Sequence, residues 1–114
     1  MIIGVGIDLV EIRRFNELRL NDNFINRIFN QSEKTLEVQS LAGRFAAREA
    51  LYKALSNKTL FQLRNIEIVN GIDGKPEFVL YNDLHEFSLL NNIYLTISHS
   101  SDYAIAMVVI ESIV

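Results

Sequence analysis

Residues 41–55 carry the clearest helical pattern in the chain. The segment is rich in alanine, leucine and arginine, which favour helices, and it contains neither proline nor a β-branched residue. At helical periodicity its small residues fall on one narrow side, which holds Gly43, Ala47, Ala50 and Ala54. Because small side chains let another backbone come close, we expect a second element to pack tightly against this helix.

The charged residues of the same helix form two ordered pairs. Arg44 and Arg48 are one turn apart, and Glu49 and Lys53 are separated by the same spacing. A Glu followed four residues later by a Lys is the favourable orientation of a surface ion pair, so spacing alone favours a solvated helix face over a catalytic site. The alternative is that these rows serve a phosphate group and its metal ion.

Alternating positions in residues 2–10 predict a β-strand. The apolar side holds Ile3, Val5, Ile7 and Leu9, and the opposite side holds Gly4, Gly6, Asp8 and Val10. The two glycines allow another element to approach the backbone beside the Asp8 carboxylate. A second interpretation stays open, because residues 8–11 also fit a capping box in which Asp8 is the N-cap of the next helix.

Two short helices are expected between this strand and the central helix. Residues 11–20 form the first, residues 21–23 break it, and residues 24–29 add one or two helical turns. Ser32 fits the N-cap position of the segment that leads into the central helix. This stretch also carries four arginines, which are Arg13, Arg14, Arg19 and Arg27. They form either an ordinary solvated face or, in an acidic protein, a docking patch for a partner.

The second half of the chain reads as two hairpins separated by a helix. Strands are expected at residues 66–69 and 77–81, around a loop with two glycines, and at residues 93–98 and 103–110. Residues 82–90 form a short helix between them, on which His85 is a surface residue. The predicted fold is α+β, with a mainly antiparallel sheet packed on the central helix, in one domain over residues 1–114.

Composition limits the chemistry that the chain can perform. It has no cysteine, which excludes disulfides and thiolate catalysis and favours a reducing cytoplasm, and its two histidines are too few for a structural zinc site. A bound metal would therefore need carboxylate ligands, as Mg²⁺ prefers. We expect no secretory signal, because no basic segment precedes an apolar stretch, and no membrane span, because no apolar run approaches 18 residues.

The charge and the hydropathy of the chain bear on its partners. The net charge of −3 argues against general nucleic-acid binding, although residues 1–53 hold eight of the eleven Lys and Arg residues. Hydrophobic residues make up 49% of the chain and the mean hydropathy is +0.15, which is apolar for so short a soluble protein. We therefore expect some of its surface to be buried between subunits.

Three stretches together resemble a known family. They are GVGIDLVEIRRF near the start, LAGRFAAREALYKAL in the middle and LTISHSSDYAIAMVV near the end. Their order, spacing and short total length resemble the holo-acyl-carrier-protein synthases, which are small bacterial 4′-phosphopantetheinyl transferases. The resemblance implies a homotrimeric, Mg²⁺-dependent enzyme of fatty acid biosynthesis. Such an enzyme moves the phosphopantetheine arm of coenzyme A to a serine of apo acyl carrier protein and releases adenosine 3′,5′-bisphosphate.

The resemblance also implies roles for particular residues. Asp8 matches a Mg²⁺-binding aspartate, and Glu49 matches the glutamate that completes the metal site and assists in removing the serine proton. Lys53 matches the lysine near the reacting phosphate. Arg44 and His99 match residues that contact coenzyme A phosphates, although without the resemblance His99 reads as a turn histidine that closes the last hairpin.

The same comparison points to the carrier-protein contact and to three departures from the family, one of which is a short connection between residues 31 and 41. Arg14 falls in the helix that grips the carrier protein, and Arg13 and Arg19 extend that patch. Arg48 stands where lysine is common, and the two cations differ in geometry. Residues 56–62 stand where the family often has a glycine-rich segment.

Two other interpretations compete with an enzyme. One is a non-catalytic oligomeric module that binds a nucleotide or an acidic partner through the arginines of residues 13–27, and it needs neither Asp8 nor Glu49. The other is a structural protein held together by its hairpins, which predicts no response to any ligand. A thermal shift with Mg²⁺ and coenzyme A, and its loss on Asp8→Asn, would separate these interpretations.

Overall fold

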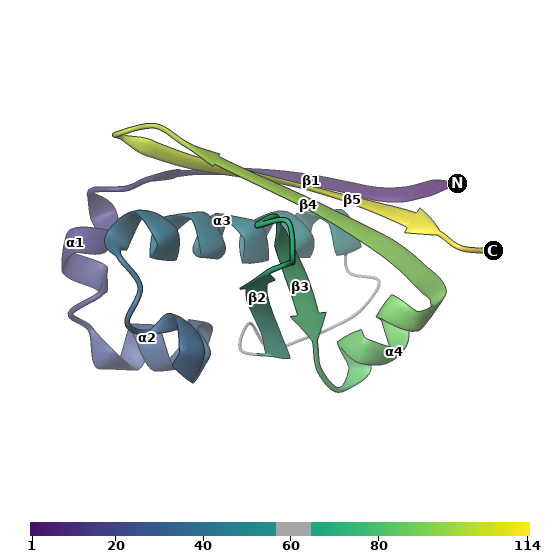
Figure 1. The fold of residues 1–114 in the computed structure, drawn as a ribbon, viewed down its shortest axis with the longest axis horizontal. Helices are drawn as coiled ribbons and strands as arrows, with labels where there is room; N and C mark the ends of the chain where they lie inside the picture. The colour runs from purple at the N-terminus through teal and green to yellow at the C-terminus, as the bar shows by residue number, and fades with distance from the viewer. Residues whose placement is uncertain (57–64) are drawn as a thin grey trace.

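The computed structural model describes residues 1–56 and 65–114, whose helices and strands are arranged as in Figure 1. Of the predicted end of the central helix at residues 56–58, only Ser56 lies within the described residues. Most of residues 56–62, which stand where the family often has a glycine-rich segment, lie outside them. In chain order the elements are β1 (Ile2–Glu11), α1 (Arg14–Leu18), α2 (Asp22–Ile28), the 3₁₀ turn η1 (Gln31–Glu33), α3 (Val38–Leu55), β2 (Ile66–Asn70), β3 (Pro76–Leu80), α4 (Asp83–Leu90), β4 (Asn91–His99) and β5 (Tyr103–Ser112).

Two antiparallel sheets surround the central helix. Strands β1, β5 and β4 pair in that order, and β2 and β3 form a separate hairpin. The three-stranded sheet lies along one side of α3, while α2, the β2–β3 hairpin and α4 lie on the other side (Figure 1). The predicted α+β fold, with a mainly antiparallel sheet packed on a central helix, is confirmed.

Helix α3 is buried because elements cover it from both sides. It begins at Val38, three residues earlier than predicted, and Ala46, Ala47, Ala50 and Ala54 are fully buried. The backbone of β1 packs directly on this helix: a Cβ atom at Gly4 or Gly6 would lie under 3.0 Å from backbone atoms of Ala54 or Ala50. The expectation that small residues bring a second element close to the helix is confirmed, and that element is β1.

The apolar side of β1 faces away from α3. Val5 is 57% exposed and Leu9 is 61% exposed, whereas Gly6 and Val10 on the other side are buried. The same exposed sheet face includes Met107 of β5, which is the pairing partner of Ile7. The alternation predicted for this strand is present, and the glycine side is the one that contacts the core.

The predicted helix over residues 11–20 is wrong at its start. Glu11 is the last residue of β1 and pairs with Tyr103, and the Ile12 amide donates to the Asp102 carbonyl at 2.8 Å. These bonds satisfy the backbone in extended form, so α1 begins only at Arg14. Asp8 lies within the strand, opposite Ala106, and does not cap a helix.

The approach to α3 also differs from the prediction. Ser32 lies in η1 and donates its hydroxyl hydrogen to Glu67 at 2.6 Å, while Glu37 occupies the N-cap position of α3. Helix α2 begins at Asp22 because the Asn21 side chain accepts from the Phe24 amide at 3.1 Å. A side-chain cap therefore starts α2, and tertiary contacts hold Ser32.

The second half of the chain matches its prediction closely. Both hairpins and α4 are present, with boundaries that differ by one or two residues from the predicted ones. The His85 side chain is exposed on α4, as expected. Within the described residues, no helix is long and apolar enough to cross a membrane.

Candidate functional site

Three of the predicted site residues meet where β1 packs on α3. The Lys53 Nζ atom donates to the Asp8 Oδ1 atom at 3.0 Å and to the Ile7 carbonyl at 3.0 Å. The Asp8 side chain is 16% exposed and that of Lys53 is 52% exposed, so the pair lies at the edge of the buried interface. Lys53 thus binds a strand residue far away in sequence as well as lying one helical turn from Glu49.

Glu49 is the second carboxylate at this contact. Partial burial raises its pKa, the negative charge of Asp8 raises it further, and the charge of Lys53 acts in the opposite direction. The coupling to Asp8 means that the two carboxylates are close enough to repel each other. Lys53 forms its ion pair with Asp8 of β1, so the spacing of Glu49 and Lys53 on the helix surface is not the whole of this site.

The donor set of this site fits a magnesium ion. Mg²⁺ in proteins is commonly held by one or two carboxylates, with water and phosphate oxygens completing its coordination. Asp8 and Glu49 supply two such groups on elements fixed by backbone contact at Gly6. Among the residues that the structure describes, no group of three or more His, Cys, Asp or Glu is placed to hold a metal ion, so this site offers two protein ligands.

Arg44 and His99 line one cavity. Its volume is about 270 Å³, and its walls come from the first half of α3, the β2–β3 hairpin and the end of β4. His99 is the exposed last residue of β4 and pairs with Ala104, so it lies at the mouth of the final hairpin. The two residues predicted to contact coenzyme A phosphates are therefore brought together from segments 55 positions apart.

Arg44 and Arg48 of α3 do not form an exposed, solvated surface of the helix. Arg48 is completely buried beneath Phe29, with its guanidinium 5.1 Å from the ring centre, and it forms an ion pair with the equally buried Glu33. Burial lowers the pKa of Arg48, and its hydrogen bond to Glu33 opposes that shift. Arg44 is mostly buried and contacts the same carboxylate at 3.4 Å.

Sequence reasoning missed Glu33 as part of this region. The signal available was the spacing of Asn30 and Glu33, which matches the N-cap and N3 positions of a capping box. The Asn30 amide donates to the Glu33 carboxylate at 3.0 Å. That local pattern predicts a turn, but it gives no indication that two arginines converge on the same carboxylate.

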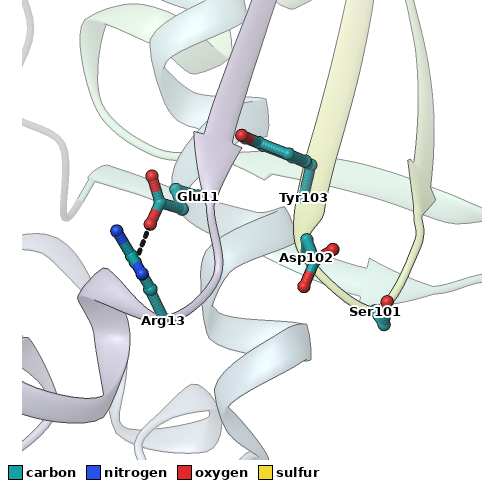
Figure 2. Close-up of a pocket in the computed structure, with 5 residues that line it drawn as sticks. All are labelled: Glu11, Arg13, Ser101, Asp102 and Tyr103. Carbon is teal, nitrogen blue, oxygen red and sulfur yellow. Dashed lines mark ion pairs between the residues drawn. The ribbon is translucent and has the colours of Figure 1, made fainter.

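The predicted partner-binding arginines lie at the opposite end of β1 from the chain terminus. Arg13 is exposed and forms an ion pair with Glu11 beside a hollow of about 350 Å³. Figure 2 shows this pair facing Ser101 and Asp102 of the β4–β5 turn and Tyr103 at the start of β5. Arg14 and Arg19 are also exposed, as is Arg27 of α2. Phe15 anchors α1 by packing against Phe45 of α3, with ring centres 5.5 Å apart.

This chain is similar to known proteins over nearly its whole length. Residues 4–108 match the model of the 4′-phosphopantetheinyl transferase superfamily. A holo-[acyl-carrier-protein] synthase of Caldicellulosiruptor saccharolyticus is 38% identical, over 97% of this chain and 98% of the relative. The chain belongs to the holo-[acyl-carrier-protein] synthase family. The enzyme class predicted from the three sequence stretches is thus confirmed.

Solved structures of this family share the fold. The holo-[acyl-carrier-protein] synthase of Neisseria meningitidis has a TM-score of 0.86 at 32% identity, covering 98% of this chain and 100% of that one. The enzyme from Bacillus anthracis, solved in complex with CoA (3′,5′-ADP), has a TM-score of 0.79 at 35% identity, covering 98% of both chains. The family therefore includes a member of the same architecture that holds coenzyme A or its adenylate part.

Proposed function

We propose that this synthase-family chain transfers the 4′-phosphopantetheine group of coenzyme A to a serine of apo acyl carrier protein. The observation that carries the proposal is the meeting of Asp8, Glu49 and Lys53 at the β1–α3 contact. In the reaction, a bond forms between the serine oxygen and the phosphorus that bears the pantetheine arm. The pyrophosphate bond breaks, and adenosine 3′,5′-bisphosphate leaves.

Each of the three residues has a distinct role in this proposal. Asp8 and Glu49 would hold Mg²⁺, which would supply charge neutralisation at the pyrophosphate. Lys53 donates to phosphate oxygens as negative charge develops on them, since its ammonium group is half-exposed and already fixed by Asp8. Glu49 also assists in removing the serine proton, as the family resemblance implies.

The cavity lined by Arg44 and His99 is the proposed site for the phosphates of coenzyme A. Arginine recognises phosphate oxygens through its planar set of donors, and histidine adds a further donor. The cavity volume of about 270 Å³ suits part of the nucleotide, and not the whole cofactor. The complex of the Bacillus anthracis relative with CoA (3′,5′-ADP) supports this assignment of ligand.

We assign carrier-protein docking to Arg13, Arg14 and Arg19. These side chains are exposed on or beside α1, the helix that follows the strand bearing Asp8. An acyl carrier protein is an acidic partner, and this chain also has a net negative charge, so attraction must come from a local basic surface. A carrier held on α1 would present its serine near the end of β1.

The exposed apolar face of the three-stranded sheet supports association between copies, and the family resemblance supplies the number three. It contains seven large side chains, each at least 37% exposed: Val5, Ile7, Leu9, Tyr94, Tyr103, Ile105 and Met107. Contiguous apolar patches of this kind mark association surfaces. We propose that identical copies cover this face, that the active site lies at the subunit boundary, and that residues 1–114 act as one domain. We also propose that the protein acts in the cytoplasm, in fatty acid biosynthesis.

Thermal unfolding with ligands tests the proposal against its competitor. Mg²⁺ together with coenzyme A is expected to raise the melting temperature, and Asp8→Asn is expected to remove most of that rise. A non-catalytic module that binds through its arginines would keep the full rise in the Asp8→Asn variant. The absence of any rise in the unmodified protein would overturn the coenzyme A assignment itself.

A further inference from the structure

Glu33 is a buried carboxylate that accepts hydrogen bonds from three residues. It is 0% exposed, and its two oxygens accept hydrogen bonds from the Asn30 backbone and side chain, from both terminal nitrogens of Arg48 and from Arg44. A buried charge is stable only when it is paired and hydrogen-bonded, and Glu33 meets both conditions. The proposed reaction gives this residue no task.

The contact with Arg44 connects Glu33 to the proposed cofactor cavity. The Arg44 Nη1 atom lies 3.4 Å from Glu33 Oε2 and also donates to the Ile68 carbonyl of β2. Arg44 and Ile68 both line the cavity that contains His99. The long arginine side chain is thus held from two sides, so its guanidinium is already ordered where a phosphate would bind.

The same carboxylate joins the β2–β3 hairpin to α3. The Ile66 carbonyl accepts hydrogen bonds from Arg48 Nη2 and from Asn30 Nδ2, both at 2.6 Å, and both donors also bind Glu33. The hairpin supplies cavity residues from both strands and from the turn, including Asn70, Gly74 and Pro76. Asn30 and Arg48 bind this wall directly, so Glu33→Gln leaves the wall two of its donors and acts on the cavity mainly through Arg44.

We propose that Glu33 is a positioning residue for coenzyme A, acting by fixing the Arg44 guanidinium against the β2 wall of the cavity. This inference rests on the proposed function, because it assigns the cavity to coenzyme A phosphates. Positioning and simple electrostatics predict opposite changes in the affinity for coenzyme A when the charge of Glu33 is removed. Removing a negative charge beside an anion site would strengthen anion binding, whereas loss of positioning weakens it.

The test compares coenzyme A affinity in the full chain and its variants by titration calorimetry with Mg²⁺ present. Glu33→Gln is expected to weaken coenzyme A binding about tenfold, the scale of one charged hydrogen bond. At saturating coenzyme A, kcat and the KM for the carrier protein should change by less than twofold. In an Arg44→Gln background, Glu33→Gln should add little, because the residue that it positions is gone. Glu86→Gln, an exposed change on α4, is the matched control.

Two further measurements keep the outcomes distinct. If Glu33→Gln fails to fold, the double variant Glu33→Gln/Arg48→Met removes both buried charges and still deprives Arg44 of its carboxylate.

Nitrogen NMR of the Arg44 guanidinium reports positioning without any ligand. The guanidinium is expected to rotate freely only when Glu33 is absent. Unchanged or tighter coenzyme A binding in the folded variant, or unchanged Arg44 rotation, overturns the inference. If the unmodified protein does not bind coenzyme A, the proposed function fails, whereas freed Arg44 rotation would still show that Glu33 orders it.

Discussion

Gly6 of β1 and Ala50 of α3 are in backbone contact, with no room for a side chain on the glycine. A Cβ atom at Gly6 would lie under 3.0 Å from the Ala50 backbone carbonyl. This contact lies between Asp8, two residues further along the strand, and Glu49, the residue before Ala50 on the helix. The spacing of the two carboxylates therefore depends on a glycine that has no chemical role.

Gly6→Ala is expected to separate the strand from the helix. Because the obstructing atoms are backbone, they cannot rotate away, and we expect a loss of about 1–3 kcal/mol in the free energy of unfolding together with a large loss of transfer activity. Denaturant unfolding and a transfer assay measure both. Gly43→Ala is the control: its new Cβ would meet only the Ile97 side chain at 3.0 Å, so it should cost less stability. Equal stability of the two variants would contradict the packing argument.

Glu49→Gln tests the electrostatics of the carboxylate pair in metal-free buffer. The pKa of Glu49 is raised in the folded state, so between its unfolded and folded pKa values the native state binds more protons than the unfolded state. The contribution of Glu49 to stability is thus full below the unfolded pKa and is lost as the pH rises through the folded pKa. The unmodified protein should lose stability over this rise, and Glu49→Gln should lose less.

Melting temperatures measured across that pH range, with and without Mg²⁺, check the prediction. Added Mg²⁺ should stabilise the unmodified protein near neutral pH and have a much smaller effect on Glu49→Gln, which should also abolish transfer while leaving the fold nearly unchanged. Identical pH profiles, or normal turnover by the variant, would sink the assignment of Glu49 to the metal.

Arg14→Glu tests the docking surface. Exposed ion pairs contribute only about 0.2–1 kcal/mol each, but reversing one charge both removes an attraction and adds a repulsion toward an acidic carrier. The KM for the carrier protein should rise strongly while the KM for coenzyme A stays nearly constant, and added salt should mimic part of the effect. Lys75→Glu, an exposed reversal on the β2–β3 turn, should leave the carrier KM unchanged. An equal loss for both substrates would argue against α1 as the docking helix.

Met107→Glu tests association through the exposed sheet face. Met107 lies opposite Ile7 on the face that bears the other exposed apolar residues of β1 and β5, so a buried carboxylate there should disrupt assembly. Light scattering is expected to show a trimer for the unmodified protein and smaller, inactive species for the variant. Ile72→Glu, at a fully exposed turn position, should keep the trimer. An active monomer of the unmodified chain would defeat the proposal.

The sequence predicts most of this fold because its strongest signals are local. The central helix follows from helix-forming residues, and both hairpins follow from alternation and turn residues in the second half of the chain. The close packing of β1 on α3 followed from the glycines and alanines of the two segments, whereas the ion pair of Asp8 with Lys53 was not predicted. The roles of these residues in catalysis stay predictions.

The features that the sequence did not predict depend on distant partners. Glu11 belongs to a strand because Tyr103 pairs with it, and no local pattern of residues 11–20 contains that information. Ser32 likewise turns toward Glu67 instead of capping α3. Glu33 is buried because Arg44 and Arg48 converge on it, although a lone glutamate in a sequence normally indicates an exposed position.

Mass spectrometry of apo acyl carrier protein tests the central claim most directly. After incubation with this protein, coenzyme A and Mg²⁺, the carrier is expected to gain the mass of one phosphopantetheine group on a serine, and omission of Mg²⁺ or the substitution Asp8→Asn should prevent the gain. A carrier whose mass stays unchanged under the complete conditions would contradict the account, and a full gain with Asp8→Asn would contradict the assignment of the metal site.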